Sequence, residues 1–181
     1  MKIDRLIENI IEQIKEAQIK LGYVKEVIRL YFPAGSLSLL LQIQEESAEV
    51  LAEQLQKESS LKDTMLGEMQ FSSCKGNRVE VCILPQGAEY VHQYVKDPPF
   101  LVSIIQLFGG NHHLTIEEIC MAFEKFNPNY ICQKMEEGMD FDYVLYFPDE
   151  TPDAWYYCIR MEMGHTIYHR FSKEDYLGFG C

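Results

Sequence analysis

The feature that most constrains the fold is a change of hydrophobic period that occurs twice along this sequence. In each half, segments with apolar residues at helical spacing come first, and short extended segments around a turn follow. In the first half we predict a helix at about 24–32, a second that begins near Ser36 or Ser38, and a third at about 45–58. A β-hairpin with its turn at 75–77 and a short helix then complete this half.

The second half repeats this order. The predicted helices of this half are PPFLVSIIQLF, TIEEICMAFEKF and PNYICQKMEEG. The predicted strands are FDYVLYF, AWYYCIRMEM and TIYHRF. Thr115 followed by Glu118 has the spacing of a capping box, which predicts that the middle helix begins there. SKEDYLGF is predicted to close the chain as a helical turn.

The first 22 residues form the clearest predicted helix. Its apolar positions recur at spacings of four and three, as in a heptad repeat: Ile3, Ile7, Ile10, Ile14, Ala17 and Leu21. A stripe this apolar must be buried, either on the body of the protein or against a partner helix. Both alternatives stay open, and the second predicts a homodimer through this helix.

Three helices followed by a hairpin is the order of a winged-helix unit. We therefore predict an α+β, mostly helical fold of two tandem winged-helix-like units, with three helices and a β-hairpin each, plus an extra N-terminal amphipathic helix. The predicted domains are residues 1–22, 23–96 and 97–181. A short internal match, in which Ile28-Arg-Leu-Tyr31 faces Ile105-Gln-Leu-Phe108, supports a duplication.

The net charge of −12 is unevenly distributed. Residues 1–96 carry 11 Lys and Arg against 14 Asp and Glu, whereas residues 97–181 carry 5 against 14. DNA binding depends largely on neutralising phosphates, so we do not expect nucleic acid as the main partner. The predicted recognition helices are also acidic, which leaves Lys75 and Arg78 in the first wing as the candidate DNA contacts.

Nothing in the sequence suggests a membrane or an oxidising compartment. No run of about 18 apolar residues occurs, and the charged N-terminus lacks the apolar core of a signal peptide. The six cysteines show no C-x-x-C pair or zinc-like grouping, so we expect reduced thiols. These features predict a cytoplasmic protein.

Two histidine pairs are the first candidates for a chemical site. His112 and His113 stand just before the capping box, but neighbouring strand residues point to opposite faces, so they would not easily share one metal ion. His165 and His169 lie in a predicted strand, about 13 Å apart at about 3.3 Å per residue, and cannot bind one ion. We predict structural roles for both pairs.

No other motif selects a catalytic, cofactor or metal site. The acidic residues Asp140, Asp142, Asp149, Glu150 and Asp153 lack the spacing of a calcium loop. We therefore predict a non-catalytic, acidic protein-interaction module without a cofactor. The candidate interaction residues are Ile3, Ile7, Ile10, Ile14, Tyr146, Tyr156 and Tyr168, since tyrosine is favoured at interfaces. A DNA-binding regulator and an enzyme with an unrecognised His, Cys or carboxylate site are the alternatives.

The stretches RLYFPAGSLSLLL, FDYVLYFPDETPDAWYYCI and IYHRFSKEDY resemble an uncharacterised bacterial family, a domain of unknown function. That resemblance covers most of the chain and implies no activity. By architecture alone, acidic tandem winged helices are also similar to the segregation-and-condensation B subunits, which bind proteins as dimers. This second similarity is an analogy of fold, with no shared motif.

Overall fold

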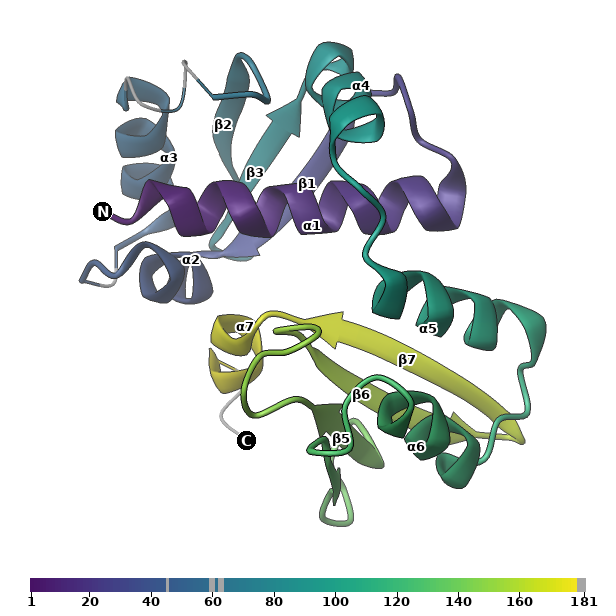
Figure 1. Cartoon of the computed structure of the whole chain (residues 1–181). Helices are drawn as coiled ribbons and strands as arrows, with labels where there is room; N and C mark the ends of the chain where they lie inside the picture. Colours follow the sequence, from purple (N-terminus) through teal and green to yellow (C-terminus); the bar gives the residue numbers. More distant parts are fainter. Residues whose placement is uncertain (45, 59–60, 62–63, 179–181) are drawn as a thin grey trace. The chain divides into compact units, whose positions relative to one another are not determined.

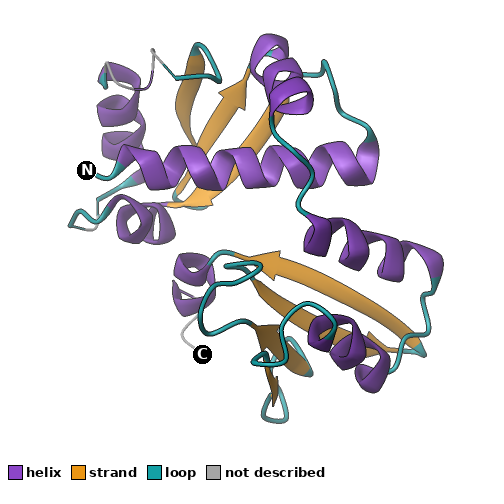
Figure 2. Cartoon of the chain, viewed as in Figure 1, coloured by secondary structure: helices purple, strands orange, loops and turns teal. Residues whose placement is uncertain are grey.

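The chain forms two compact units, Met1–Asp97 and Pro98–Cys181, in a computed structural model that describes residues 1–44, 46–58, 61 and 64–178 (Figure 1). Each unit combines helices with one antiparallel sheet, so the fold class is α+β as predicted (Figure 2). The sequence placed a boundary between residues 96 and 97, and it also separated residues 1–22, which here belong to the first unit.

The first unit contains a three-stranded sheet of strand order β1-β3-β2. Its elements are α1 (Ile3–Leu21), β1 (Ile28–Pro33), α2 (Ala34–Leu41), α3 (Ala48–Lys57), β2 (Met69–Cys74), β3 (Arg78–Ile83) and α4 (Pro85–Tyr94). The predicted helix at 24–32 is therefore wrong. Ile28, Leu30 and Phe32 are buried and alternate with exposed residues, which is the period of a strand.

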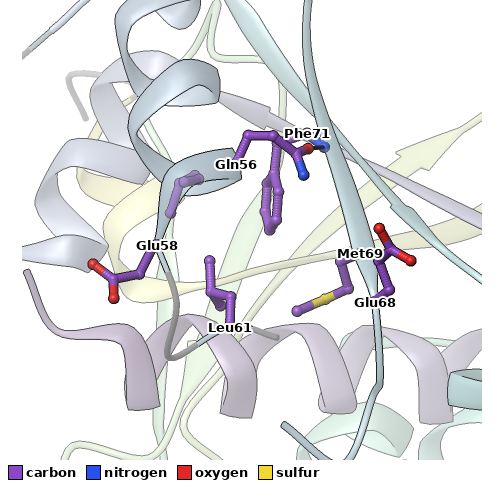
Figure 3. Close-up of a pocket in the computed structure, with 7 residues that line it drawn as sticks. Gln56, Glu58, Leu61, Glu68, Met69 and Phe71 are labelled. Atoms are coloured by element: carbon purple, nitrogen blue, oxygen red, sulfur yellow. Dashed lines mark hydrogen bonds between the residues drawn. The ribbon is translucent and has the colours of Figure 1, made fainter. Parts of the chain in front are cut away.

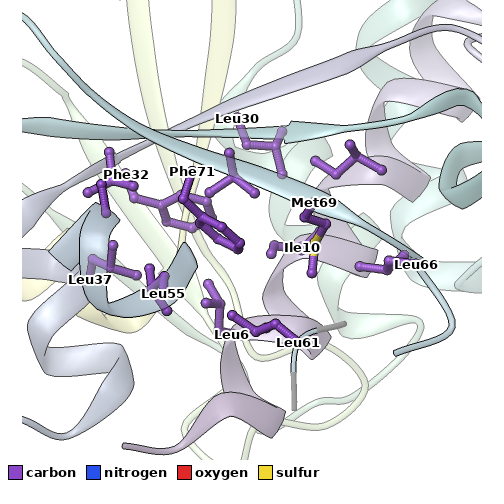
Figure 4. Packing of buried hydrophobic residues seen from close by; sticks show 14 of the residues in the cluster. Leu6, Ile10, Leu30, Phe32, Leu37, Leu55, Leu61, Leu66, Met69 and Phe71 are labelled. Atoms are coloured by element: carbon purple, nitrogen blue, oxygen red, sulfur yellow. The ribbon is translucent and has the colours of Figure 1, made fainter. Parts of the chain in front are cut away.

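Helix α1 packs its apolar stripe into the core of the first unit. Leu6, Ile10 and Ile14 are fully buried among side chains of the sheet and of α2 and α3 (Figure 4). Figure 1 shows α1 lying across one face of this sheet. The helix ends at Gly22, whose positive φ of 71° suits glycine and whose N–H donates to the Gln18 carbonyl.

Two polar side chains of α1 are buried with it and join it to the end of the unit. Lys15 donates to the Val95 carbonyl at 2.9 Å and forms an ion pair with Asp97. Gln18 donates through Nε2 to the Ala88 carbonyl of α4 at 2.8 Å. Because a buried ammonium needs such partners, these bonds fix the position of α1 along α4.

The turn of the β2–β3 hairpin is tied to two helices. Asn77 has a positive φ of 51°, and its carbonyl accepts from the N–H of Ala34, where α2 begins. Its side-chain oxygen accepts from the N–H of Ala48, the first residue of α3, at 3.0 Å. The predicted hairpin is confirmed, and its turn also caps α3.

The second unit contains a four-stranded antiparallel sheet of strand order β4-β5-β6-β7. Its elements are α5 (Pro99–Gly110), α6 (Ile116–Glu124), β4 (Ile131–Lys134), β5 (Tyr143–Tyr146), β6 (Tyr156–Glu162), β7 (His165–Phe171) and α7 (Lys173–Gly178). The helix predicted at PNYICQKMEEG is wrong, because residues 131–134 pair with β5 as an edge strand. The internal match is also not a structural repeat, since it aligns β1 with part of α5.

Helices α5 and α6 share one core with the sheet of the second unit. The ring of Phe100 on α5 meets those of Phe123, Phe147 and Tyr157 edge to face, with centroids 4.9 to 5.6 Å apart. The predicted capping box begins α6, where Thr115 Oγ1 and the Glu118 carboxylate each accept from the other's backbone N–H. The predicted helix start is therefore confirmed.

A buried ion pair joins β7 to the segment before β6. Arg170 donates through Nη2 to Asp153 at 3.3 Å, and both side chains are at most 4% exposed. Asp153 also accepts from the Tyr157 hydroxyl at 2.9 Å and from the Trp155 N–H at 2.8 Å. The guanidinium lies 4.2 Å from the centroid of the Trp155 ring, a cation–π contact that further balances its charge.

None of the helices in the described part of the chain combines the length and the apolar character that a membrane crossing requires.

Candidate functional site

The structure brings together two histidines that the sequence assigned to different pairs. His113 precedes α6 and His165 begins β7, yet their rings stack with centroids 5.1 Å apart. His113 Nδ1 lies 2.5 Å from the Gly164 carbonyl, and the His112 carbonyl accepts from the N–H of Thr166. Both imidazoles therefore help to join the loop before α6 to the β6–β7 turn, a structural role.

The spacing of His165 and His169 does not bring the two imidazoles together as a metal site. His165 and His169 both lie on β7, as the strand prediction required, and His169 contacts Phe141, with ring centroids 5.5 Å apart. Across the described residues, no three His, Cys, Asp or Glu side chains are grouped so that they could hold a metal ion.

Two of the three candidate tyrosines form one stack, and the third lies elsewhere. The rings of Tyr146 and Tyr156 are parallel at 4.4 Å, and Tyr176 of α7 continues the stack at 4.6 Å. Burial, followed by the neighbouring Tyr146, raises the pKa of Tyr156. Tyr168 instead packs against the core, with its ring 4.6 Å from that of Phe108.

The candidate isoleucines of α1 are occupied within the chain. Ile10 and Ile14 are fully buried in the core of the first unit, and Ile3 and Ile7 are partly buried against it. Self-association through this helix stays a prediction, but in this fold it would use little of the stripe that suggested it.

The candidate DNA contacts Lys75 and Arg78 are both exposed at the hairpin turn. Arg78 already pairs in register with Cys74 of β2 and Pro33 of β1, so the turn alone extends beyond the sheet. On neighbouring α3, Glu49, Glu53 and Lys57 are exposed, and Lys57 pairs with Glu53. The charge of Lys57 on α3 is therefore offset by a carboxylate, whereas Lys75 and Arg78 extend the positive charge of the turn.

A small cavity lies in the first unit between α3 and β2 (Figure 3). Its volume is about 10 Å³, which suits at most one water molecule. Phe71 and Met69 point into it, whereas Glu58 and Glu68 lie at opposite sides. Gln56 is engaged as an acceptor for the N–H of Phe71 at 2.9 Å, so this cavity is a packing defect and not a binding site.

A larger, open depression lies on the second unit, beside the ends of β4, β5 and β6. Its volume is about 230 Å³, and its lining combines acidic and methionine side chains with one arginine: Met139, Asp140, Asp142, Arg160, Met161 and Glu162. Among the described residues, the lining of this depression and that of the small cavity include no histidine and no cysteine. We name this depression the acidic methionine surface.

Hydrogen bonds of Asp142 hold together the strands that carry this surface. The N–H of Asp142 donates to the Ile159 carbonyl and its carbonyl accepts from the N–H of Met135, both at 2.8 Å, so it joins β5 to strands on both sides. One carboxylate oxygen accepts from the N–H of Met161 at 2.6 Å. Another lining carboxylate, that of Glu162, forms an exposed ion pair with Arg160 at 3.1 Å, which contributes little stability.

The methionine side chains of this surface are open to solvent. Met139 and Met161 are 42% and 40% exposed, and the adjoining Met163 is 93% exposed. Methionine is flexible and polarisable, so it adapts to the shape of a partner side chain. In the sequence these acidic and methionine residues stand in two separate runs, MEEGMD and RMEM, and only the fold places them beside one depression.

The acidic residues considered for calcium separate into distinct environments. Asp140 and Asp142 belong to the acidic methionine surface, whereas Asp153 is buried with Arg170. Asp149 accepts from Asn127, and Glu150 pairs with Lys173.

Comparison with known proteins supports the similarity inferred from the sequence. A family model matches residues 3–179, and that family is described as "Domain of unknown function, E. rectale Gene description (DUF3877)". No curated protein and no solved structure matches the chain, so the analogy with segregation-and-condensation B subunits gains no support.

Proposed function

The chain belongs to this family of domains of unknown function, and we propose that it is a non-catalytic protein-interaction module whose second unit binds a cationic segment of a partner protein. The observation that carries the proposal is the depression of about 230 Å³ in which exposed methionines alternate with carboxylates. Such a surface offers adaptable apolar contact and negative charge in one place.

Charge favours a basic occupant. The lining of the depression includes three carboxylates, Asp140, Asp142 and Glu162, and one arginine, Arg160. Two further carboxylates, Glu136 and Glu137, are exposed in the adjoining loop. Lysine or arginine side chains of a partner would meet opposite charge, and the apolar side chains between them would contact Met139 and Met161. An amphipathic basic helix has both features.

A binding measurement with a defined probe tests this function. We expect a labelled amphipathic peptide of lysine and leucine to bind the full chain, with affinity falling as salt rises. The double variant Asp140→Lys and Glu162→Lys should bind it roughly tenfold more weakly, a change of about 1.4 kcal/mol. A peptide of glutamate and leucine should not bind.

The matched control makes the same change of charge on the other unit. Glu8 and Glu46 are exposed, and Glu8→Lys with Glu46→Lys should leave binding within about twofold of the original, apart from long-range screening effects. Equal weakening by both double variants would mean that net charge, and not the acidic methionine surface, attracts the peptide, and the proposal would fail.

A second function has a specific observation in its favour. The element order of the first unit is α1, β1, α2, α3 and then the β2–β3 hairpin, which is the order of a winged helix. We propose that the first unit is a winged helix. Its exposed turn residues Lys75 and Arg78 would then contact DNA phosphates, while the acidic α3 stays out of the groove.

Gel retardation of mixed genomic DNA at low salt tests this second function. Binding that weakens steeply with salt and is lost in Lys75→Ala with Arg78→Ala would support it. Absence of any retardation by the full chain at low salt would remove it.

A further inference from the structure

One cation of the chain lies within the acidic methionine surface. Arg160 lines the depression, and its Nη2 lies 3.1 Å from Oε2 of Glu162. Both residues belong to β6 and are two positions apart, so their side chains share one face of the strand. Among the described residues, neither side chain forms another ion pair. The Arg160 guanidinium therefore has its ionic partner inside the surface itself.

The pair of Arg160 and Glu162 is easy to separate. The two side chains are 47% and 54% exposed, so water can replace the contact, and the pair contributes little to stability. The backbone between them is held in place, because the N–H of Met161 donates to the Asp142 carboxylate at 2.6 Å. Release of the guanidinium therefore requires rotation of side chains only and leaves the depression intact.

The surface carries more negative charge than Arg160 balances. Its lining includes three carboxylates and one guanidinium. Within the described part of the chain, the Asp140 carboxylate forms no hydrogen bond or ion pair, and that of Asp142 accepts only from the N–H of Met161. A cation that enters the depression therefore meets two carboxylates without a cationic partner, beside the one that Arg160 occupies.

We propose that the cation taken up by this surface is an arginine side chain of the partner, and that Arg160 is its internal competitor for Glu162. This inference rests on the proposed function, since it concerns the occupant of the same surface. A guanidinium presents five N–H donors in a planar fork, whereas the lysine ammonium is a compact point charge. Several carboxylates around one depression suit the fork, because one guanidinium can donate to more than one of them.

Competition has a direct consequence for affinity. When the partner's guanidinium binds at Glu162, the existing ion pair must break, and the charge of Arg160 repels the incoming cation. An uncharged side chain at position 160 removes both penalties. Arg160 thus acts as an autoinhibitory contact that lowers the affinity of the surface for a cationic segment.

Peptide binding to the full chain tests this role. The probes are two amphipathic peptides, one of arginine and leucine and one of lysine and leucine. Arg160→Gln should bind the arginine peptide roughly fivefold more tightly than the original chain does, a change of about 1 kcal/mol, the upper end for an exposed ion pair. Both proteins should prefer the arginine peptide. Equal affinity for the two peptides would overturn the assignment of arginine.

The matched control removes the same charge elsewhere in the second unit. Lys125 is exposed at the end of α6 and does not line the depression. Lys125→Gln should change the affinity by less than about twofold, since it acts only through long-range charge. Equal tightening by Lys125→Gln and Arg160→Gln would mean that net charge sets the affinity, and the competitor role would fail.

A double-mutant cycle tests whether Arg160 acts through Glu162. In Glu162→Gln the carboxylate is already absent, so adding Arg160→Gln should tighten binding by about twofold, through loss of repulsion alone. A fivefold gain both with and without the Glu162 carboxylate would show that the two side chains do not act together, which excludes competition for Glu162.

The same titrations separate this inference from the proposed function. If neither peptide binds the original chain or any variant, the proposed function fails and this inference fails with it. If the peptides bind but Arg160→Gln leaves the affinity unchanged, only the competitor role fails. Binding that is detectable only after Arg160→Gln supports the competitor role. Circular dichroism of each variant checks that the fold is retained.

Discussion

At the scale of single residues, the pair of Asp153 and Arg170 should contribute strongly to the stability of the second unit. Both side chains are buried, so the Asp153→Asn change removes the negative charge that faces the guanidinium in this pair. Removing one member of a buried ion pair costs about 3–5 kcal/mol. We expect the midpoint of urea unfolding, followed by Trp155 fluorescence, to fall accordingly.

The exposed pair of Arg160 and Glu162 supplies the control for this prediction. Glu162→Gln makes the same carboxylate-to-amide change at a side chain that is 54% exposed. Its effect on unfolding should stay within about 1 kcal/mol. Similar losses in both variants would show that burial does not set the strength of the Asp153 pair.

Tyr130 should make the second unit sensitive to alkaline pH. Its pKa in the folded chain is about 12, above its ordinary value of 10.0, so the folded state holds this proton more tightly than the unfolded state. The resulting stability is complete below pH 10.0 and is lost as the pH rises toward 12. Tyr130→Phe should therefore show a shallower loss of stability over that interval.

Urea unfolding at several alkaline pH values, with dithiothreitol present, measures this slope. Cys132 has a raised pKa of about 12 as well, so Cys132→Ser should flatten the curve from its ordinary value of 9.0 upward. A Tyr130→Phe curve that follows the original chain would contradict the raised pKa of the hydroxyl.

At the scale of elements, the hairpin turn should hold the first unit together through Asn77. Its positive φ of 51° disfavours alanine, and its side chain caps α3. Asn77→Ala therefore combines backbone strain with the loss of a cap of about 1 kcal/mol, whereas Asn77→Gly loses the cap alone. We expect the alanine variant to unfold at lower urea than the glycine variant, as followed by circular dichroism. The reverse order would show that backbone strain at this turn is not limiting.

The sequence predicted elements well where local signals were strong. The capping box of Thr115 and the hairpin turn at Asn77 both formed as expected, because the residues that define each, Thr115 with Glu118 and Cys74 with Arg78, are close in the sequence. At β1, alternation of Ile28, Leu30 and Phe32 was present but was interpreted as helical, and the Pro33 that follows suits a strand end better than a helix interior.

Strand β4 had no comparable signal. All four of its residues are exposed, so no alternation between buried and exposed positions marks it in the sequence. Its pairing with β5 decides its conformation, and that contact involves residues about twelve positions away. The acidic methionine surface was missed for the same reason, because Met139 and Met161 meet only once β4, β5 and β6 are paired.

At the scale of the whole molecule, the role of α1 decides whether the chain needs a second copy. Ile10 is fully buried in the first unit, whereas Leu21 of the same predicted stripe is 62% exposed. If α1 acts within the chain, Ile10→Ala should cost about 2–5 kcal/mol and Leu21→Ala less than about 0.5 kcal/mol.

Protein concentration separates the two roles of α1. Packing within the chain gives urea midpoints that do not change with concentration, in the original chain and in Ile10→Ala alike. A dimer through α1 would instead raise the midpoint of the original chain as concentration rises, because association stabilises by mass action. Sedimentation of the same samples gives the mass directly. A concentration-dependent midpoint that Ile10→Ala abolishes would mean that the buried stripe of α1 is exchanged between copies, whereas a constant midpoint assigns Ile10 to the core of a single chain.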